Sequence, residues 1–149
     1  MAGRRVTTLH LLLACALLAA CGDSTGPQGT AGTFTLISVN GSAPPSLVGA
    51  TPNCDQYIAS GTGSLALTRD FELSGTVRFD CTRSGGAIVD QPLSLAGSYA
   101  LHGQQLTFTI PGVAAIPGRL VGDTLSTTIP ASQFTFPVPV ALVFVRVVE

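Results

Sequence analysis

The chain has 149 residues, of which 46% are hydrophobic and only 10% are charged, and its formal net charge is −1. The basic residues are arginines scattered along the chain, and there is no lysine. Because binding to a phosphate backbone requires clustered positive charge, this composition argues against a nucleic-acid partner. The length suits one domain with its own core and a short flanking segment.

The first 20 residues have the pattern of a secretory signal peptide. Arg4 and Arg5 form a positive start, and residues 9–20 are an apolar stretch interrupted only by His10. This stretch is too short to cross a bilayer as a permanent helix, and its flanks are those of a secretory signal. We therefore expect residues 1–20 to be removed from the mature protein.

The signal ends in Leu18-Ala19-Ala20-Cys21, which resembles the lipobox of bacterial lipoproteins. The resemblance implies that Cys21 becomes the new N-terminus and carries a diacylglyceryl group and an N-acyl chain such as palmitate. Several acyl chains hold a protein stably in a lipid bilayer. We expect a protein anchored in the bacterial cell envelope, facing the periplasm, and in the outer rather than the inner membrane because Gly22 follows the cysteine. An ordinary signal peptide with a chance cysteine is the alternative.

Residues 22–31 predict a flexible tether between this anchor and a folded domain at residues 32–149. The tether is rich in Gly, Ser and Thr and has no large apolar residue, a composition typical of disorder. Its root-mean-square span would be about 17–19 Å. After signal removal, five arginines face eight acidic side chains, a balance of −3.

Two cysteines remain for the folded domain. Cys15 leaves with the signal and Cys21 is lipidated, so Cys54 and Cys81 are left. An even pair in an oxidising compartment favours a disulfide. A redox pair and half of a metal site are the alternatives, although neither cysteine lies in a Cys-x-x-Cys spacing and no histidine is near in sequence.

Alternation of apolar and polar residues predicts strands through most of the domain. The pattern is clearest at 71–81 and 93–102, and shorter at 106–110 and 125–129. Less regular strands are expected at 33–40 and 64–68, and the last strand, 138–148, is apolar on both faces except for Arg146. No window of ten or more residues outside the signal has helical periodicity.

The connections predict an antiparallel meander. Residues 69–70, 102–103 and 122–123 contain Gly or Asp and suit tight hairpin turns. Segments 41–53, 82–91 and 130–137 are richer in Pro, Gly and Ser and are expected to be loops. The predicted fold is therefore all-β, an up-and-down meander of about eight strands that closes into a small barrel. A β-sandwich is the alternative.

Three segments resemble the small bacterial lipocalin-like β-barrel lipoproteins, namely Gly-Thr-Phe-Thr-Leu at 32–36, Gly-Ser-Tyr-Ala-Leu-His-Gly-Gln-Gln-Leu-Thr-Phe at 97–108 and Gly-Arg-Leu-Val-Gly-Asp-Thr-Leu at 118–125. Phe34 stands where lipocalins have the tryptophan of a Gly-x-Trp motif. The resemblance implies that Arg146, near the last strand, packs over this ring through a cation–π contact. The first strand would then pair with the last and close the barrel.

The aromatic residues are candidates for the barrel interior. Side chains fill the interior of an eight-stranded barrel almost completely, so a filled core is expected, with a small apolar ligand cavity as the alternative. In that second case Arg146 would orient a ligand headgroup. The interior or ligand-lining candidates are Phe34, Phe79, Tyr99, Phe108, Phe144 and Arg146.

The chain has no catalytic signature. His102 is the only histidine beyond the signal, and there is no Gly-x-Ser-x-Gly elbow, phosphate loop or histidine-rich metal set. We expect a protein that is not an enzyme and needs no cofactor or metal. One hypothesis is a binding module for a small apolar ligand, which a deep apolar cavity would favour. The other is a structural or interaction lipoprotein that contacts an envelope protein, for example as a hydrolase inhibitor, which a filled barrel with an exposed apolar rim would favour.

Overall fold

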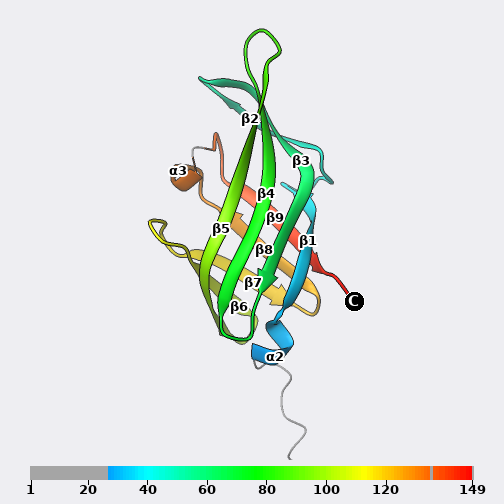
Figure 1. Ribbon diagram of the computed structural model, residues 1–149, viewed down its shortest axis with the longest axis vertical. Helices are drawn as coiled ribbons and strands as arrows, with labels where there is room; N and C mark the ends of the chain where they lie inside the picture. The colour runs from blue at the N-terminus through cyan, green and yellow to red at the C-terminus, as the bar shows by residue number, and fades with distance from the viewer. Residues whose placement is uncertain (1–26, 135, 149) are drawn as a thin grey trace, which may run out of the picture.

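The computed structural model describes residues 27–134 and 136–148, and these form a closed antiparallel β-barrel (Figure 1). The signal peptide and Cys21 lie outside the described residues. The elements, in chain order, are α2 (Pro27–Thr30), β1 (Gly32–Val39), β2 (Ser46–Thr51), β3 (Cys54–Leu67), β4 (Glu72–Thr82), β5 (Ile88–His102), β6 (Gln105–Thr109), β7 (Ile116–Val121), β8 (Thr124–Ile129), α3 (Ala131–Phe134) and β9 (Val140–Arg146).

Eight strands make the barrel, and β1 closes it. The hydrogen-bonded order is β1-β9-β8-β7-β6-β5-β4-β3, and β1 pairs with β3 as well as with β9. Phe34 lies directly opposite Leu65 on β3 and Arg146 on β9. The predicted up-and-down barrel and its closure by the first and last strands are therefore confirmed, and the sandwich alternative is wrong.

The predicted alternation places one side of each strand in the core. On β4, the buried side chains include Leu73, Val77 and Phe79, whereas the polar residues between them face outward. Strand β9 buries Val140, Leu142 and Phe144 completely, and the side chains between them are only partly exposed. One continuous cluster of apolar side chains fills the barrel.

The structure corrects the expected loops at 41–53 and 82–91 and the expected start of one strand. Segment 41–53 contains β2, which pairs with the first half of β3. Strand β3 begins at Cys54 rather than near residue 64, and the loop expected at 82–91 shrinks to residues 83–87 between β4 and β5. Strand β7 was not recognised as a separate element, because Pro117 and Gly118 interrupt its pattern and both residues disfavour strands.

The two ends of the barrel differ. At the end that carries α2, the strands meet in short connections; we call this the closed end. At the other end, β3, β4 and β5 rise past the remaining strands, and β2 and α3 flank them (Figure 1). Residues 88–97 of β5 pair with β4 but not with β6, which ends its pairing at Ser98. We call this second end the mouth.

Residues 27–31, expected to belong to the tether, pack at the closed end. They include the single turn α2, and Thr30 is 2% exposed. The folded unit thus begins about five residues before the expected boundary at residue 32.

Candidate functional site

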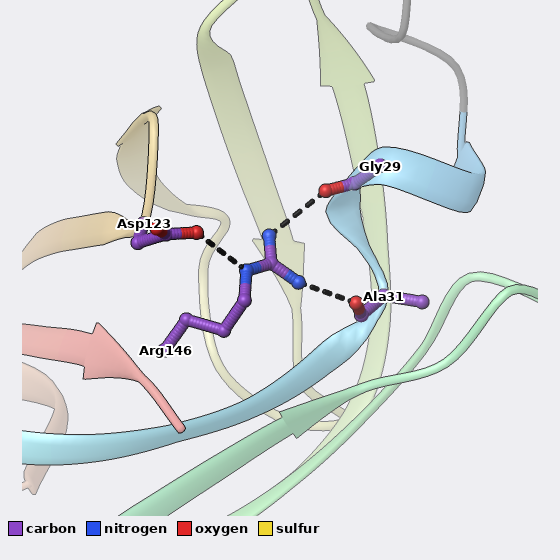
Figure 2. Close-up of polar contacts among 4 residues, drawn as sticks. All are labelled: Gly29, Ala31, Asp123 and Arg146. Carbon is purple, nitrogen blue, oxygen red and sulfur yellow. Dashed lines mark hydrogen bonds and ion pairs between the residues drawn. The ribbon is translucent and has the colours of Figure 1, made fainter. Parts of the chain in front are cut away.

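At the closed end, Arg146 ties three parts of the chain together (Figure 2). Its Nε donates to the carboxylate of Asp123 at 3.0 Å, and its two terminal nitrogens donate to the backbone carbonyls of Gly29 and Ala31. The guanidinium carbon lies 4.8 Å from the centre of the Phe34 ring, so the structure has the expected contact between the two side chains. Since all three guanidinium nitrogens are engaged, Arg146 fastens the barrel end and is not free to orient a ligand.

The interior of the barrel is filled. Phe34, Phe79 and Phe144 are fully buried, and Tyr99 and Phe108 are each 3% exposed. The space left between these strands, lined in part by Phe108 and Phe144, is about 10 Å³, roughly enough for one water molecule. The aromatic residues singled out from the sequence therefore form core, and none of them lines a ligand-sized cavity.

A much larger hollow lies at the mouth. This mouth cleft has a volume of about 800 Å³ and is open to solvent, a size typical of small-molecule sites. Its walls come from the β2–β3 hairpin, the ends of β4 and β5, and the segment around α3. The lining residues are Ala50, Thr51, Pro52, Asn53, Cys54, Tyr57, Cys81, Arg83, Gln91, Ala131, Ser132, Phe136 and Pro137.

Tyr57 and Phe136 line the bottom of the mouth cleft, and Phe79 packs beneath them in the core. Tyr57 stacks on Phe79 with ring centres 5.5 Å apart, and Phe136 meets Tyr57 edge-on at 5.6 Å and Phe79 at 4.9 Å. The Tyr57 hydroxyl donates to Oε1 of Gln91 at 3.1 Å. Burial raises the pKa of Tyr57 above its ordinary value, so this hydroxyl stays protonated at neutral pH. Tyr57 and Phe136 are 7% and 6% exposed, so only the edges of their rings reach the cleft.

The Cys54–Cys81 disulfide forms part of the wall. It joins β3 to β4 with a Cα–Cα distance of 5.4 Å, across a sequence separation of 27 residues. The predicted bridge is confirmed. Because its two residues line the mouth cleft, the bridge fixes the wall as well as the fold.

Sequence reasoning missed the residues that line this cleft apart from the two cysteines. Tyr57 lies in the half of β3 that was not recognised as a strand, and Phe136 lies in a segment expected to be a loop. Two features of the sequence could have indicated this site: Tyr57 lies three residues after Cys54, and Phe136 lies in the Pro-rich segment 130–137. His102 lies at the other end of the barrel and is exposed.

Among residues 27–134 and 136–148, no three His, Cys, Asp or Glu side chains gather as a group that could hold a metal ion. No helix in this described part is long and apolar enough to span a membrane. No family model, curated protein or solved structure matches the chain. The candidate site therefore has to be argued from its own geometry.

Proposed function

We propose that the protein is a membrane-anchored lipoprotein of the bacterial cell envelope, outer membrane rather than inner, whose barrel is a non-catalytic binding module. The anchor is supported by the signal pattern and by the lipobox-like residues that end in Cys21. The beginning of the fold also supports it, since α2 starts at Pro27, only a few residues after the proposed lipidated cysteine.

The observation that carries the binding role is the contrast between the two spaces. The barrel interior leaves about 10 Å³, whereas the mouth cleft offers about 800 Å³ above Tyr57 and Phe136. A small ligand with an apolar body would therefore bind at the mouth and not within the barrel. Contact with the apolar lining of the cleft would supply the driving force, because affinity for apolar ligands rises with the apolar area removed from water; that lining includes Ala50, Pro52, Ala131 and Pro137 and the edges of the Tyr57 and Phe136 rings.

A second function is favoured by the same filled barrel. A structural or interaction lipoprotein, including an inhibitor of an envelope hydrolase, needs a rigid body with exposed apolar contacts. Leu47, Ile88 and Val138 are 61%, 69% and 42% exposed. Leu47 lies on β2 and Ile88 at the tip of the β4–β5 hairpin, both next to the mouth. Such side chains suit a protein partner that covers this end.

The anchor is tested with Cys21→Ser in the full-length precursor. We expect this variant to leave the membrane fraction or to accumulate as an uncleaved precursor. Metabolic labelling with a palmitate analogue should mark the wild type and not the variant. A variant that is processed and fractionates like the wild type would contradict the lipoprotein proposal.

The two binding roles are separated by native mass spectrometry of the protein purified from its host. A bound small molecule that disappears in Ser132→Trp, which fills the mouth cleft, supports the ligand role. Ser94→Trp, on the outer face of β5, is the matched control. Absence of a small molecule, together with a protein that co-purifies with the wild type and is lost in Ile88→Asp, supports the interaction role.

A further inference from the structure

We propose that the mouth cleft binds an anionic amphiphile, whose apolar body lies against the apolar lining around Tyr57 and Phe136 and whose acidic group pairs with Arg83. This inference rests on the ligand-binding role proposed above and specifies the chemical class of the ligand.

The charge of the cleft is the first argument. Arg83 is the only charged side chain among the residues that line it, so the lining carries one positive charge and no negative one. The five arginines of the described residues face six acidic side chains. The positive charge of the lining is therefore local, since the described residues as a whole carry more acidic than basic side chains. Such a local charge favours negatively charged ligands.

The second argument is that Arg83 has no partner. Elsewhere in the described part of the chain, Arg78 pairs with Asp90 and Arg146 with Asp123, and Arg119 donates to Gln104 at 2.9 Å; Arg69, at the closed end, is unpaired like Arg83 but lies far from the cleft. Within that same part, the guanidinium of Arg83 makes no hydrogen bond or ion pair. Its planar fork of N–H donors therefore remains available for a carboxylate, sulfonate or phosphate, which it can bind through two hydrogen bonds.

The carboxylate of Asp55 lies beside Ser84, the residue that follows Arg83. It accepts a hydrogen bond from the Ser84 hydroxyl at 3.0 Å, it is exposed, and it does not line the cleft. Asp55 therefore binds Ser84, whereas the Arg83 side chain makes no ion pair with it and lines the cleft.

The backbone of Arg83 is held in place before any ligand binds. Its N–H donates to the carbonyl of Ala87 at 2.8 Å, and its carbonyl accepts from Gly86 at 2.9 Å. Cys81, two residues earlier, is tied to β3 by the disulfide. These bonds fix the backbone from which the guanidinium extends; the side chain itself is exposed and becomes ordered only when a ligand binds.

The test uses two dyes with the same apolar body, anilinonaphthalene sulfonate and the parent anilinonaphthalene, which lacks the acidic group. They are titrated into the mature chain from Gly22 without acyl groups, whose described part is a closed barrel with its own core. We expect the sulfonate to bind with one-to-one stoichiometry. Arg83→Gln should weaken it severalfold, as expected for an ion pair in a solvent-exposed cleft, and should leave the neutral dye nearly unchanged.

Arg69→Gln is the matched control, because Arg69 is also exposed, lies in the turn between β3 and β4 at the closed end, and has no side-chain partner among the described residues. This variant should bind both dyes like the wild type. Displacement of the sulfonate dye by decanoate or by decyl phosphate supports the proposal and distinguishes a carboxylate ligand from a phosphate ligand. If decanol displaces the dye and neither decanoate nor decyl phosphate does, the proposal is contradicted.

Two failures remain distinguishable. If Arg83→Gln weakens both dyes equally or neither, while Ser132→Trp abolishes binding, the anionic preference is refuted and the small-ligand role stands. If neither dye binds the wild type, or if Ser132→Trp leaves binding unchanged, the cleft is not a small-molecule site and both proposals fall.

Discussion

At the scale of single residues, Phe34 and Arg146 show how an aromatic core residue and a charged group can share the end of a barrel. The two residues face each other across β1 and β9. Phe34 is fully buried, and Arg146 covers its ring while its nitrogens reach carbonyl and carboxylate oxygens at the rim. The arginine thus closes the apolar interior without leaving its own charge unpaired.

This arrangement predicts coupled losses of stability. Phe34→Ala should lower the free energy of unfolding by about 3–5 kcal/mol, as expected for a buried aromatic residue. Arg146→Ala should cost about 1–3 kcal/mol because it removes hydrogen bonds to Asp123, Gly29 and Ala31. The double variant should lose less than the sum, since the two side chains are in contact. Urea unfolding measures all three values.

Arg119→Ala combined with Phe34→Ala is the control for this cycle, because the Arg119 side chain bonds only Gln104. The losses in free energy of unfolding from Phe34→Ala and Arg119→Ala should be additive. Full additivity in the Phe34–Arg146 cycle would show that the contact between them contributes nothing to stability.

The two tyrosines predict a decline in stability at alkaline pH. Burial raises the pKa of Tyr57 and of Tyr99 above the ordinary value of 10.0. The folded state therefore keeps these protons at a pH where the unfolded chain has released them. By linkage, their contribution is fully present below pH 10 and is lost as the pH rises from there through the folded-state pKa.

The melting temperature between pH 9 and pH 11 tests this prediction. Tyr57→Phe and Tyr99→Phe should each make the decline shallower. Tyr99→Phe should also be less stable at neutral pH, because the Tyr99 hydroxyl donates to the carbonyl of Thr68 at 2.6 Å. An unchanged slope in both variants would exclude these tyrosines as its cause.

At the scale of elements, the regular strands were predictable and the irregular ones were not. Strand β4, and β5 from Leu93 onward, alternate because one face packs in the core and the other meets water. Strand β2 and the first half of β3 pair with each other as a local hairpin, but the register shifts twice between Leu47 and Thr51, which interrupts the alternation of buried and exposed residues. Apolar and polar residues do not alternate regularly in such strands, so the sequence pattern does not identify them.

The disulfide predicts a large effect at this scale. Replacing both Cys54 and Cys81 by Ala should lower the free energy of unfolding by about 3–4 kcal/mol, the chain-entropy value for a loop of this length. Chemical unfolding of the double variant checks the value. Thiol labelling of denatured, unreduced wild type should find neither cysteine reactive; two reactive thiols there would contradict the bridge.

Close approach of two strands predicts a second effect. A Cβ atom at Gly97 on β5 would overlap the carbonyl oxygen of Thr109 on β6. Gly97→Ala should therefore destabilise the barrel by about 1–3 kcal/mol through overpacking. Ser98→Ala, at the next and exposed position, should change stability by less than about 0.5 kcal/mol. Equal melting temperatures of the two variants would show that β5 and β6 can move apart at this position without a loss of stability.

At the scale of the whole molecule, the sequence predicted the barrel but not the cleft. The barrel follows from alternation and short turns, which are local properties. The mouth cleft is assembled from the β2–β3 hairpin, the β4–β5 end and the α3 segment, three parts brought together only by the closed sheet. Phe136 shows the difficulty, because its contacts with Tyr57 and Phe79 join residues far apart along the chain.

The position of α2 predicts how the proposed lipoprotein sits on its membrane. Residues 22–26 span at most about 20 Å between Cys21 and Pro27, and α2 lies at the closed end (Figure 1). The closed end should therefore face the bilayer and the mouth should point away. The chain has no tryptophan, so a single introduced one reports on its site. Brominated lipids should quench Val121→Trp at the closed end but not Ile88→Trp at the mouth hairpin; equal quenching would contradict this orientation.

The pairing of Phe34 with Arg146 also sets an order of events in time. Strands β1, β3, β4 and β5 find their partners within the first two-thirds of the chain, so they can pair before the last strand is in place. The seam between β1 and β9 joins positions separated by most of the domain and has to wait for the last strand. Until then β1 and β8 each present an unpaired edge that invites aggregation. A chain of this design is most vulnerable in the interval between the synthesis of β8 and the arrival of β9.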